Sequence, residues 1–407
     1  MTAAPIGPSR FHATAFVLIA VFLDMVGFGL IIPVLPSLIA DVGHVDLAQA
    51  SRIGGWMFAA FSLAQFLFAP LMGNLSDRFG RRPLLLLAIG GLGVDYLFHA
   101  FAPTLLWLFV GRIVAGICGA SYVIANAYLA DITPPAERAR AFGLIGAAFG
   151  FGFIAGPALG GFLGELGPRI PFFVAAALSG LNLIYGLIVL PESLPQGLRR
   201  PVNWRACNPL GTLKVFARYP GVLPMGTALG VYLFASAVYP AIWPYWGMAK
   251  FGWSEGMVGL TLAGYGVVAA IFQGGLAGPL ASRLGEARVA AIGLIVGIGM
   301  TIALGLSTSL VMVLIVLLIT GIEGLVHPMI ASLMSNAVPE DAQGALQGGI
   351  SALMNLAMLA GTLFFTQVFG IFLAENAPIR TPDMAFFVAS VILLAALALF
   401  VRARKVE

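Results

Sequence analysis

The chain has very few charged residues for its length. Of its 407 residues, only 9% are Asp, Glu, Lys or Arg, while 60% are hydrophobic. A soluble globular chain contains about 25% charged residues, so this one lacks the ionic groups to cover a water-exposed surface of its size. A soluble protein is therefore excluded, and most of the exterior is expected to face lipid.

Several other features are scarce or missing. The two cysteines, Cys118 in an apolar run and Cys207 in a polar segment, form neither a disulfide framework nor a metal site. The sequence contains no Walker phosphate-binding loop, zinc motif or nucleophile arrangement, which disfavours an enzyme and an ATP-driven pump. The net charge of +4 arises from short basic clusters between apolar runs. Nucleic acid is therefore not expected as a partner.

Apolar runs long enough to cross a bilayer as a helix, which takes about 20 residues, dominate the sequence. There are twelve, at residues 14–40, 53–75, 84–102, 105–131, 139–164, 169–190, 220–248, 256–281, 288–306, 309–337, 344–373 and 383–401. Connections such as 102–104 and 307–309 are so short that the helices they join must be antiparallel. The first run is too long for a removable signal peptide. The sequence predicts an all-α integral membrane protein with twelve transmembrane helices.

Basic residues are distributed unevenly between alternate connections. One set holds sixteen of them: Arg10, Arg78, Arg81, Arg82, Arg138, Arg140, Arg199, Arg200, Arg205, Lys214, Arg218, Arg283, Arg288, Arg402, Arg404 and Lys405. The opposite set holds only Arg52, Arg169, Lys250 and Arg380, and Arg112 lies inside a span. Because positive residues are retained in the cytoplasm, both termini are predicted to be cytoplasmic.

A polar segment at the middle of the chain divides it into two halves. We predict an N-terminal six-helix bundle at 1–190, a cytoplasmic linker at 191–219 and a C-terminal six-helix bundle at 220–407. The loops at 73–83 and 278–285 align at an offset of 205 residues. A weak repeat of this kind is typical of transporters built from two related halves, with the substrate site between them.

Four charged residues lie within apolar spans: Asp24, Asp95, Arg112 and Glu323. Each costs about 2.5–3.5 kcal/mol at a helix centre, so such residues are functional by default. The alternative is a structural salt bridge between Arg112 and an acid on another helix. Because burial favours the neutral form of a carboxyl group, Asp24 and Asp95 are the candidates for a proton carrier.

Two histidines follow these acids by one helical turn. Asp95 with His99, and Glu323 with His327, form pairs that could relay protons. An interfacial position is the alternative for His99, and a locally satisfied polar cluster is the alternative for the second pair. Pro328 is expected to loosen the helix there, and Glu323 could serve as the counter-ion of a substrate cation.

Further polar and aromatic residues are expected to line a substrate cavity. Arg112 and Asn126 are fourteen residues apart, which brings them within about 40° of one helical face. Aromatic residues of the seventh span could form a wall for a flat apolar substrate, although an interfacial belt is equally compatible with Trp243, Tyr245 and Trp246. The predicted substrate-binding set is Asp24, Asn126, Tyr232, Tyr239, Trp243, Gln273, Glu323, His327 and Asn355, and the predicted proton-coupling set is Asp24, Asp95, Arg112, Glu323 and His327.

Two segments place special demands on the backbone. In the 73–83 loop, glycines allow a tight turn, and Asp77 is expected to accept bonds from backbone N–H groups at a helix N-terminus. In the fifth span, glycines recur every fourth residue, so another backbone can approach that face closely, as suits a seam where two halves rock. The residues of interest in these two segments are Gly73, Asp77, Arg78, Gly80, Arg81, Arg82, Gly152, Gly156, Pro157 and Gly160. The alternative for the arginines is that they only set the topology.

These segments resemble the signatures of the major facilitator superfamily. Gly73 to Pro83 is similar to its loop 2-3 signature, and Leu108 to Ala120 and Gly152 to Gly161 are similar to two signatures of its proton-coupled drug-export branch. Leu23 to Pro36 and Asp95-Tyr96-Leu97 look most like tetracycline/proton antiporters. The resemblance implies two pseudo-symmetric bundles and a conformational switch formed by the residues of the 73–83 loop and the fifth-span glycines, in which the loop latches the outward-facing state. It also implies export from a bacterial cytoplasmic membrane and a proton gradient as the energy source, without a cofactor.

The second half departs from the tetracycline antiporter pattern. Those antiporters carry an acid in the ninth span and a histidine in the eighth, but Val296 and Ala269 align there, and only Gln273 keeps the local polarity. This argues against tetracycline and favours another substrate, with Glu323 and His327 taking over. We therefore predict a monomeric proton-coupled exporter of a small amphipathic drug or metabolite. A proton symporter that imports a small organic solute is the alternative, and a membrane receptor or enzyme is a remote one.

Overall fold

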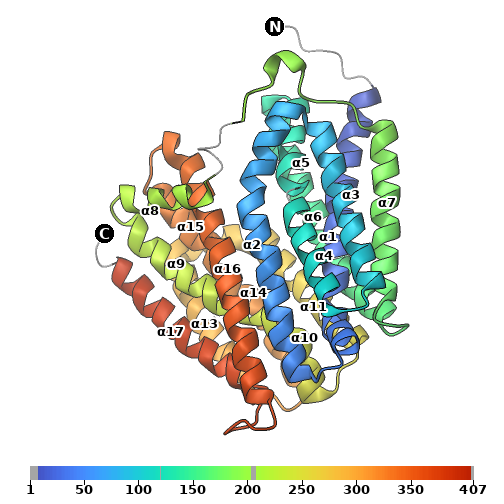
Figure 1. Ribbon diagram of the computed structural model, residues 1–407. Coiled ribbons are helices and arrows are strands. Elements are labelled where there is room, and N and C mark those ends of the chain that lie inside the picture. The colour runs from blue at the N-terminus through green and yellow to red at the C-terminus, as the bar shows by residue number, and fades with distance from the viewer. Residues whose placement is uncertain (1–7, 120, 203–207, 405–407) are drawn as a thin grey trace. The chain divides into compact units, whose positions relative to one another are not determined.

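The computed structural model describes residues 8–119, 121–202 and 208–404 (Figure 1). Ala120, Arg205, Cys207 and Lys405, which were named above, lie outside these ranges. Every span is helical, because a backbone within lipid must satisfy its hydrogen bonds internally. Within the described ranges, twelve helical segments are long and apolar enough to cross a membrane, and each overlaps one of the predicted runs. The prediction of a twelve-span, all-α protein is confirmed.

The chain forms two compact units. The first contains Met1–Leu38 and Ala60–Asn208, and the second contains Ile39–Ala59 and Pro209–Glu407. The division near residue 208 lies within the predicted linker. Residues 39–59, which include the first part of α2, belong to the second unit.

The first unit is built mainly from long antiparallel helices. Its elements are α1 (Pro8–Gly43), α2 (Leu47–Phe79), α3 (Arg81–Phe101), α4 (Leu105–Cys118), α5 (Ser121–Ile132), η1 (Pro135–Glu137), α6 (Arg138–Gly164), α7 (Ile170–Val189) and η2 (Gln196–Leu198). A cluster of buried apolar residues, including Phe16, Leu85, Ile89 and Tyr128, joins α1, α3 and α5. This packing fixes the helices that carry Asp24 and Asp95.

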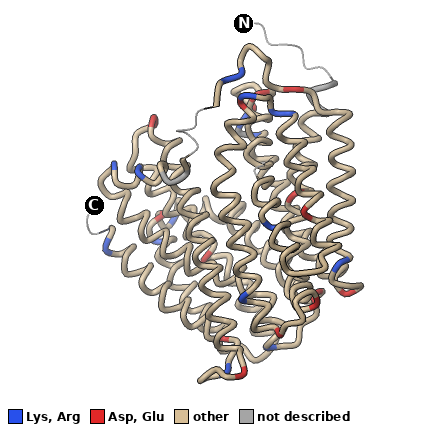
Figure 2. The backbone as a smooth tube through the Cα atoms, in the orientation of Figure 1, with Lys and Arg blue, Asp and Glu red and all other residues tan. Residues whose placement is uncertain are grey.

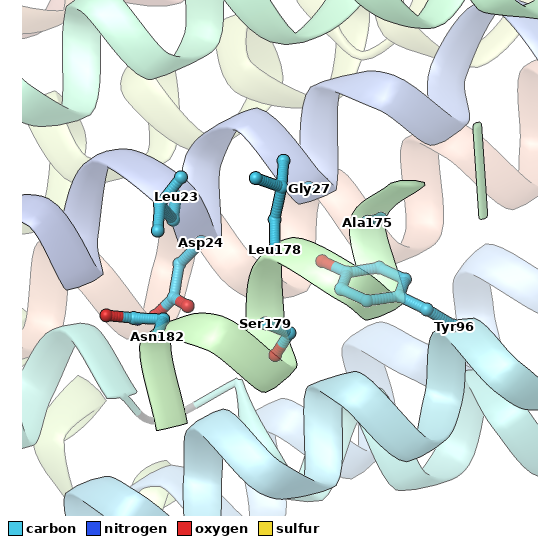
Figure 3. A pocket seen from close by; sticks show the side chains of 8 residues that line it. All are labelled: Leu23, Asp24, Gly27, Tyr96, Ala175, Leu178, Ser179 and Asn182. Atoms are coloured by element: carbon cyan, nitrogen blue, oxygen red, sulfur yellow. The ribbon is translucent and has the colours of Figure 1, made fainter. Parts of the chain in front are cut away.

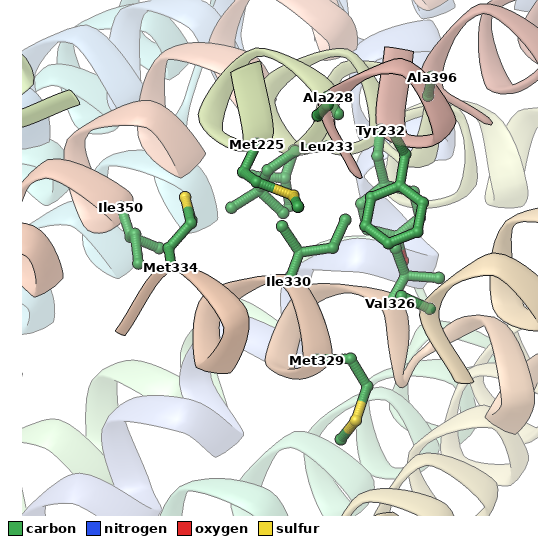
Figure 4. Packing of buried hydrophobic residues seen from close by; sticks show 14 of the residues in the cluster. Met225, Ala228, Tyr232, Leu233, Val326, Met329, Ile330, Met334, Ile350 and Ala396 are labelled. Carbon is green, nitrogen blue, oxygen red and sulfur yellow. The ribbon is translucent and has the colours of Figure 1, made fainter. Parts of the chain in front are cut away.

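The second unit repeats this plan with more interruptions. Its elements are η3 (Pro209–Lys214), α8 (Val215–Arg218), α9 (Val222–Ser236), α10 (Val238–Phe251), α11 (Glu255–Ala270), the π-helical turn η4 (Ile271–Leu276), α12 (Ala277–Leu284), α13 (Glu286–Leu306), α14 (Leu310–Glu323), α15 (Val326–Asn336), η5 (Glu340–Ala342), α16 (Gln343–Leu373) and α17 (Met384–Arg404). Its buried cluster places Tyr232 and Leu233 of α9 near Val326 and Ile330 of α15 (Figure 4).

The interruptions occur beside polar residues. One span breaks between α14 and α15, so its first part ends at Glu323 and its second begins at Val326. Pro328 lies in the first turn of α15 and has no N–H to bond the carbonyl of Gly324, which is consistent with the break. Glu323 and His327 therefore lie on two different helices rather than one turn apart on a continuous one.

The internal repeat is visible in the backbone. Gly80 precedes α3 with φ of 107°, and Gly285 precedes α13 with φ of 82°. Both values lie in the left-handed region, which favours glycine. The offset of 205 residues found in the sequence thus relates two turns of the same local geometry.

Charged residues gather at the ends of the helices within each unit, and few lie at mid-height (Figure 2). This distribution agrees with the sequence analysis. The few exceptions form the candidate site.

Candidate functional site

Asp24 of α1 lies beside a small cavity in the first unit, to which α3 and α7 also contribute. The cavity is lined by Leu23, Asp24, Gly27, Tyr96, Ala175, Leu178, Ser179 and Asn182 (Figure 3). Asp24 and Asn182 line the same cavity (Figure 3), and the side chain of Ser121 on α5 lies near the carboxyl group of Asp24. The Tyr96 hydroxyl lies directly against Gly27, where any Cβ would overlap it. Asp24 is therefore set among neutral polar groups.

Asp95, by contrast, lies between a charged and a polar partner. Its Oδ2 accepts a hydrogen bond of 2.5 Å from the guanidinium of Arg112 on α4, and both residues are buried. Arg112 Nε donates to His99 Nε2 at 3.1 Å. Because His99 Nε2 is an acceptor, the ring proton is on Nδ1, which lies 2.9 Å from the Asp95 carbonyl oxygen and 3.0 Å from Oδ1. The three side chains form a closed triad.

The interfacial alternative for His99 is wrong. Its side chain is fully buried and its ring stacks on Phe172 of α7 at a centroid distance of 5.1 Å. The alternative of a salt bridge for Arg112 matches the geometry. Asn126, expected to share a face with Arg112, instead donates a hydrogen bond to the Tyr122 carbonyl in its own helix, and α4 ends between the two residues at Cys118.

Glu323 is the centre of a polar cluster in the second unit. Its carboxyl oxygens accept hydrogen bonds from Tyr239 Oη on α10 at 2.7 Å and from Ser236 Oγ on α9 at 3.3 Å. Tyr232 Oη donates to the Glu323 backbone carbonyl at 3.2 Å. A Cβ at Gly297 of α13 would lie 3.0 Å from the Glu323 carboxyl carbon. The carboxyl group therefore lies against the ninth span, one residue beyond Val296.

The other residues predicted for the substrate site have different surroundings. Gln273, in the π-helical turn, places its amide 3.4 Å from where a Cβ on Gly324 would be, so it lies beside the break after Glu323. His327 Nε2 is buried without a hydrogen-bond partner among the described residues. Asn355 is half-buried on α16. Trp243 is buried, donates to Thr261 Oγ1 at 2.9 Å and packs with other tryptophans, which gives it a structural role.

The 73–83 loop is held by two acids of the first unit. Arg81 forms ion pairs with Asp77 at 2.5 Å and with Asp131 at 3.2 Å, and its guanidinium also donates to Ser76 Oγ. The expectation for Asp77 is therefore wrong in this structure, because its carboxylate pairs with a side chain rather than with the N-terminus of a helix. Gly73 lies inside α2, and the turn itself is at Gly80.

Glu192, which the sequence analysis did not single out, makes the contact with a helix N-terminus that was expected of Asp77. Its carboxylate accepts hydrogen bonds from the backbone N–H groups of Arg81 at 2.8 Å and Arg82 at 3.3 Å, at the start of α3. Arg82 also donates to the Leu187 carbonyl at 2.8 Å. A carboxylate at a helix N-terminus is favourable for the dipole and for the free N–H groups. The chain that follows α7 is thereby tied to the loop.

The glycine face of α6 packs on α1 of the same unit. Cβ atoms at Gly152 and Gly156 would lie 2.6 Å and 2.7 Å from the carbonyl oxygens of Phe22 and Val26, and one at Gly160 would overlap Leu30. The expected close backbone approach is confirmed. The prediction that these glycines form a seam between the two halves is wrong, because α1 of the same unit covers their face.

The comparisons with known proteins agree with this architecture. A family model for the Major Facilitator Superfamily matches residues 17–362 and, in a second match, residues 225–407. The class C tetracycline resistance protein of Escherichia coli is 39% identical over 358 residues, which cover 88% of this chain and 90% of that protein. The class B protein of the same species is 34% identical over 361 residues, 88% of each chain. Multidrug resistance protein 2 of Bacillus subtilis is 29% identical over 363 residues, 88% and 87% of the two chains.

Solved structures show the same fold. A bacterial homologue of the human lysosomal transporter Spinster has a TM-score of 0.80 at 17% identity, covering 99% of this chain and 98% of that one. The human organic anion transporter MFSD10 has a TM-score of 0.70 at 24% identity, covering 97% and 100%.

Twelve spans in two repeated units, with carboxyl groups held inside the spans, define a secondary transporter of small molecules. The chain belongs to the major facilitator superfamily, and its bacterial relatives in the tetracycline resistance group cover most of its length. It is a multi-pass protein of the bacterial cytoplasmic membrane.

Proposed function

We propose that this protein is a monomeric antiporter that exports a small amphipathic drug or metabolite in exchange for protons, by alternating access. The proton gradient supplies the energy, and the cycle uses no cofactor, nucleic acid partner or enzymatic step. The names of the relatives, which are resistance proteins, support the direction of transport.

The observation that carries this proposal is the difference between the three membrane-embedded acids. Asp95 is neutralised by Arg112, so changing its charge would break a buried ion pair, at a large cost. Asp24 and Glu323 form no ion pair with Lys, Arg or His in the described ranges. A carboxyl group surrounded by neutral donors can gain or lose a proton without that cost. We assign the proton carrier to Asp24, in the first unit.

Glu323 is the proposed counter-ion for the substrate in the second unit. Tyr239 and Ser236 hold its carboxyl group in one orientation against Gly297. The carboxyl group of Glu323 thus lies at the ninth span, where the antiporters that this chain resembles carry an acid, although Glu323 itself belongs to the tenth span. In the eighth span, this chain has Ala269 where those antiporters have a histidine. This altered arrangement favours an organic cation with an apolar body over tetracycline.

Substrate-driven proton movement in everted membrane vesicles tests the proposal. Respiration acidifies the vesicle interior, and ethidium, an amphipathic cation, is added outside. An exporter will carry ethidium inward as protons leave, so the gradient will fall in part, and Asp24→Asn will abolish this response. A full response in Asp24→Asn would remove Asp24 as the carrier. Release of preloaded ethidium together with protons would instead establish the import alternative.

A further inference from the structure

The cavity beside Asp24 contains a polar group whose bonding capacity is unused. Asn182 of α7 is only 3% exposed, and neither its Nδ2 nor its Oδ1 has a hydrogen-bond partner among the described residues. An amide left unpaired in an apolar interior is costly, and such groups are almost always satisfied by protein or by buried water. The amide therefore points to a ligand in the cavity.

The protein groups around the cavity do not supply that partner. Ser179 Oγ donates to the Ile89 carbonyl at 2.8 Å, and the lining residues Leu23, Ala175 and Leu178 are apolar. Two polar groups of the lining remain: the hydroxyl of Tyr96, which lies against Gly27, and the carboxyl group of Asp24 (Figure 3).

The size of the cavity limits what it can hold. The volume open to the centre of a water molecule is about 10 Å³, which is enough for roughly one water molecule. An organic substrate is excluded. A water molecule suits the site because it both donates and accepts, as the Asn182 amide also does.

We propose that one buried water molecule joins Asp24 to Asn182, and that Asp24 exchanges its proton through this water. The Nδ2–H of Asn182 donates to the water oxygen, and Oδ1 accepts one of its O–H groups. On loading, a proton arriving on the water is transferred to an Asp24 carboxylate oxygen, which leaves a neutral water and a neutral carboxyl group. On release, the same O–H bond breaks and the proton returns to the water.

Other titratable and charged groups near Asp24 do not provide this route. Tyr96 of α3 presents its hydroxyl to Gly27. The next acid on α3, Asp95, is engaged by Arg112 of α4 and by His99. On α5 and α7, the groups that face the carboxyl are the neutral side chains of Ser121 and Asn182. Asn182 is thus a positioning residue that acts on Asp24 through the water.

Infrared difference spectroscopy of the purified full-length protein, between acidic and alkaline buffer, tests the inference without a substrate. The carbonyl band of protonated Asp24 is identified as the band that Asp24→Asn removes. In Asn182→Leu, which fills the site with apolar atoms, this band will move to higher wavenumber because the carboxyl loses its hydrogen bond. In Asn182→Ser, which keeps a polar anchor, it will stay near the wild-type position.

The same variants are measured for ethidium-driven proton movement in everted vesicles. Asn182→Leu is expected to slow the response by about tenfold, since proton transfer to a positioned group depends on its hydrogen-bonded partner, while Asn182→Ser retains most of it. If Asn182→Leu does not fold, Asn182→Ala replaces it and must be slower than Asn182→Ser. An unchanged Asp24 band and an unchanged rate in Asn182→Leu, or in Asn182→Ala where that variant replaces it, would overturn the inference.

The inference rests on the proposed function, but the two can fail separately. If Asp24→Asn abolishes the proton response and Asn182→Leu leaves it intact, the water route is wrong and the antiporter assignment stands. If wild-type protein shows no Asp24 carboxyl band and no ethidium response, the assignment of Asp24 as the carrier is itself wrong.

Discussion

The hydroxyl of Tyr239 on α10 donates a 2.7 Å hydrogen bond to the carboxyl group of Glu323 on α14. With the bond from Ser236 on α9, it anchors an acidic side chain that is 3% exposed and forms no ion pair in the described part of the chain. Neutral donors orient the carboxyl group without cancelling its charge. In its ionised form, Glu323 would therefore present an uncompensated negative charge to the cation proposed above as substrate.

Replacing Glu323 by Gln will weaken the affinity for cationic probes. The amide keeps nearly the same volume, and its oxygen still accepts a hydrogen bond from Tyr239, so folding is retained. Ethidium binding to the purified protein, measured by fluorescence, is expected to weaken by about tenfold or more, because a charged hydrogen bond contributes roughly 1.5–3 kcal/mol.

Glu286→Gln is the matched control in the same unit. Glu286 starts α13 and accepts hydrogen bonds from Ser332 and Asn336 near the end of the span. This variant should bind ethidium as the wild type does. Equal losses in Glu286→Gln and Glu323→Gln would indicate a general charge effect and argue against a site at Glu323.

The single variant Arg112→Leu is expected to destabilise the first unit more than the double variant in which Asp95 is also replaced by Leu. Arg112→Leu leaves Asp95 buried without its cation, which costs about 3–5 kcal/mol. In the double variant Asp95→Leu with Arg112→Leu, no buried charge remains, so part of that stability returns. Thermal unfolding in detergent, followed by intrinsic fluorescence, measures both. A double variant less stable than Arg112→Leu would show that the triad stabilises the unit beyond the charge pair.

Gly80 and Gly285 provide a paired test of the two repeated turns. Alanine at either position must combine a positive φ with an extended ψ, a backbone region that is essentially restricted to glycine and costs about 1–3 kcal/mol. At Gly80 the new Cβ would also overlap the Glu192 carboxylate, whereas nothing lies within 4 Å at Gly285. Gly80→Ala should therefore lower the melting temperature further than Gly285→Ala. The reverse order would contradict the position of Glu192.

Two glycines of α6 are expected to respond in opposite directions to the same substitution. Gly156→Ala places a Cβ 2.7 Å from the Val26 carbonyl oxygen of α1, and such overpacking costs about 1–3 kcal/mol. Gly150 has open space around it, so Gly150→Ala should be neutral or gain up to about 1 kcal/mol of helix propensity. Unfolding midpoints of the two variants give the comparison. Equal stability would show that α1 and α6 are not in close contact.

Much of this fold can be predicted from the sequence because lipid imposes strong rules. The apolar runs fix the twelve spans, and Gly80 and Gly285 reveal the repeat through a backbone requirement. Asp95 and Arg112 stand out because charges are rare in spans, and their position on antiparallel helices with a short connection makes them natural partners. These features depend on local composition or on neighbouring helices.

The rest depends on contacts between distant segments. Glu192 lies 111 residues from its bond partner Arg81, and nothing in its polar surroundings marks it as a helix cap. Asn182 gave a weak signal, as a lone amide in an apolar run, but only the packing of α1, α3 and α7 shows that it faces Asp24. The helix break after Glu323 separates it from His327, which simple periodicity places one turn away on the same face.

The link between Asp95 and Arg112 also bears on how the protein is made. Their helices, α3 and α4, are joined by only residues 102–104. A lone charge entering lipid costs about 2.5–3.5 kcal/mol, and this penalty is reduced when the two charges enter as a pair. During biogenesis, α3 and α4 are therefore expected to leave the insertion machinery together, as a single helical hairpin.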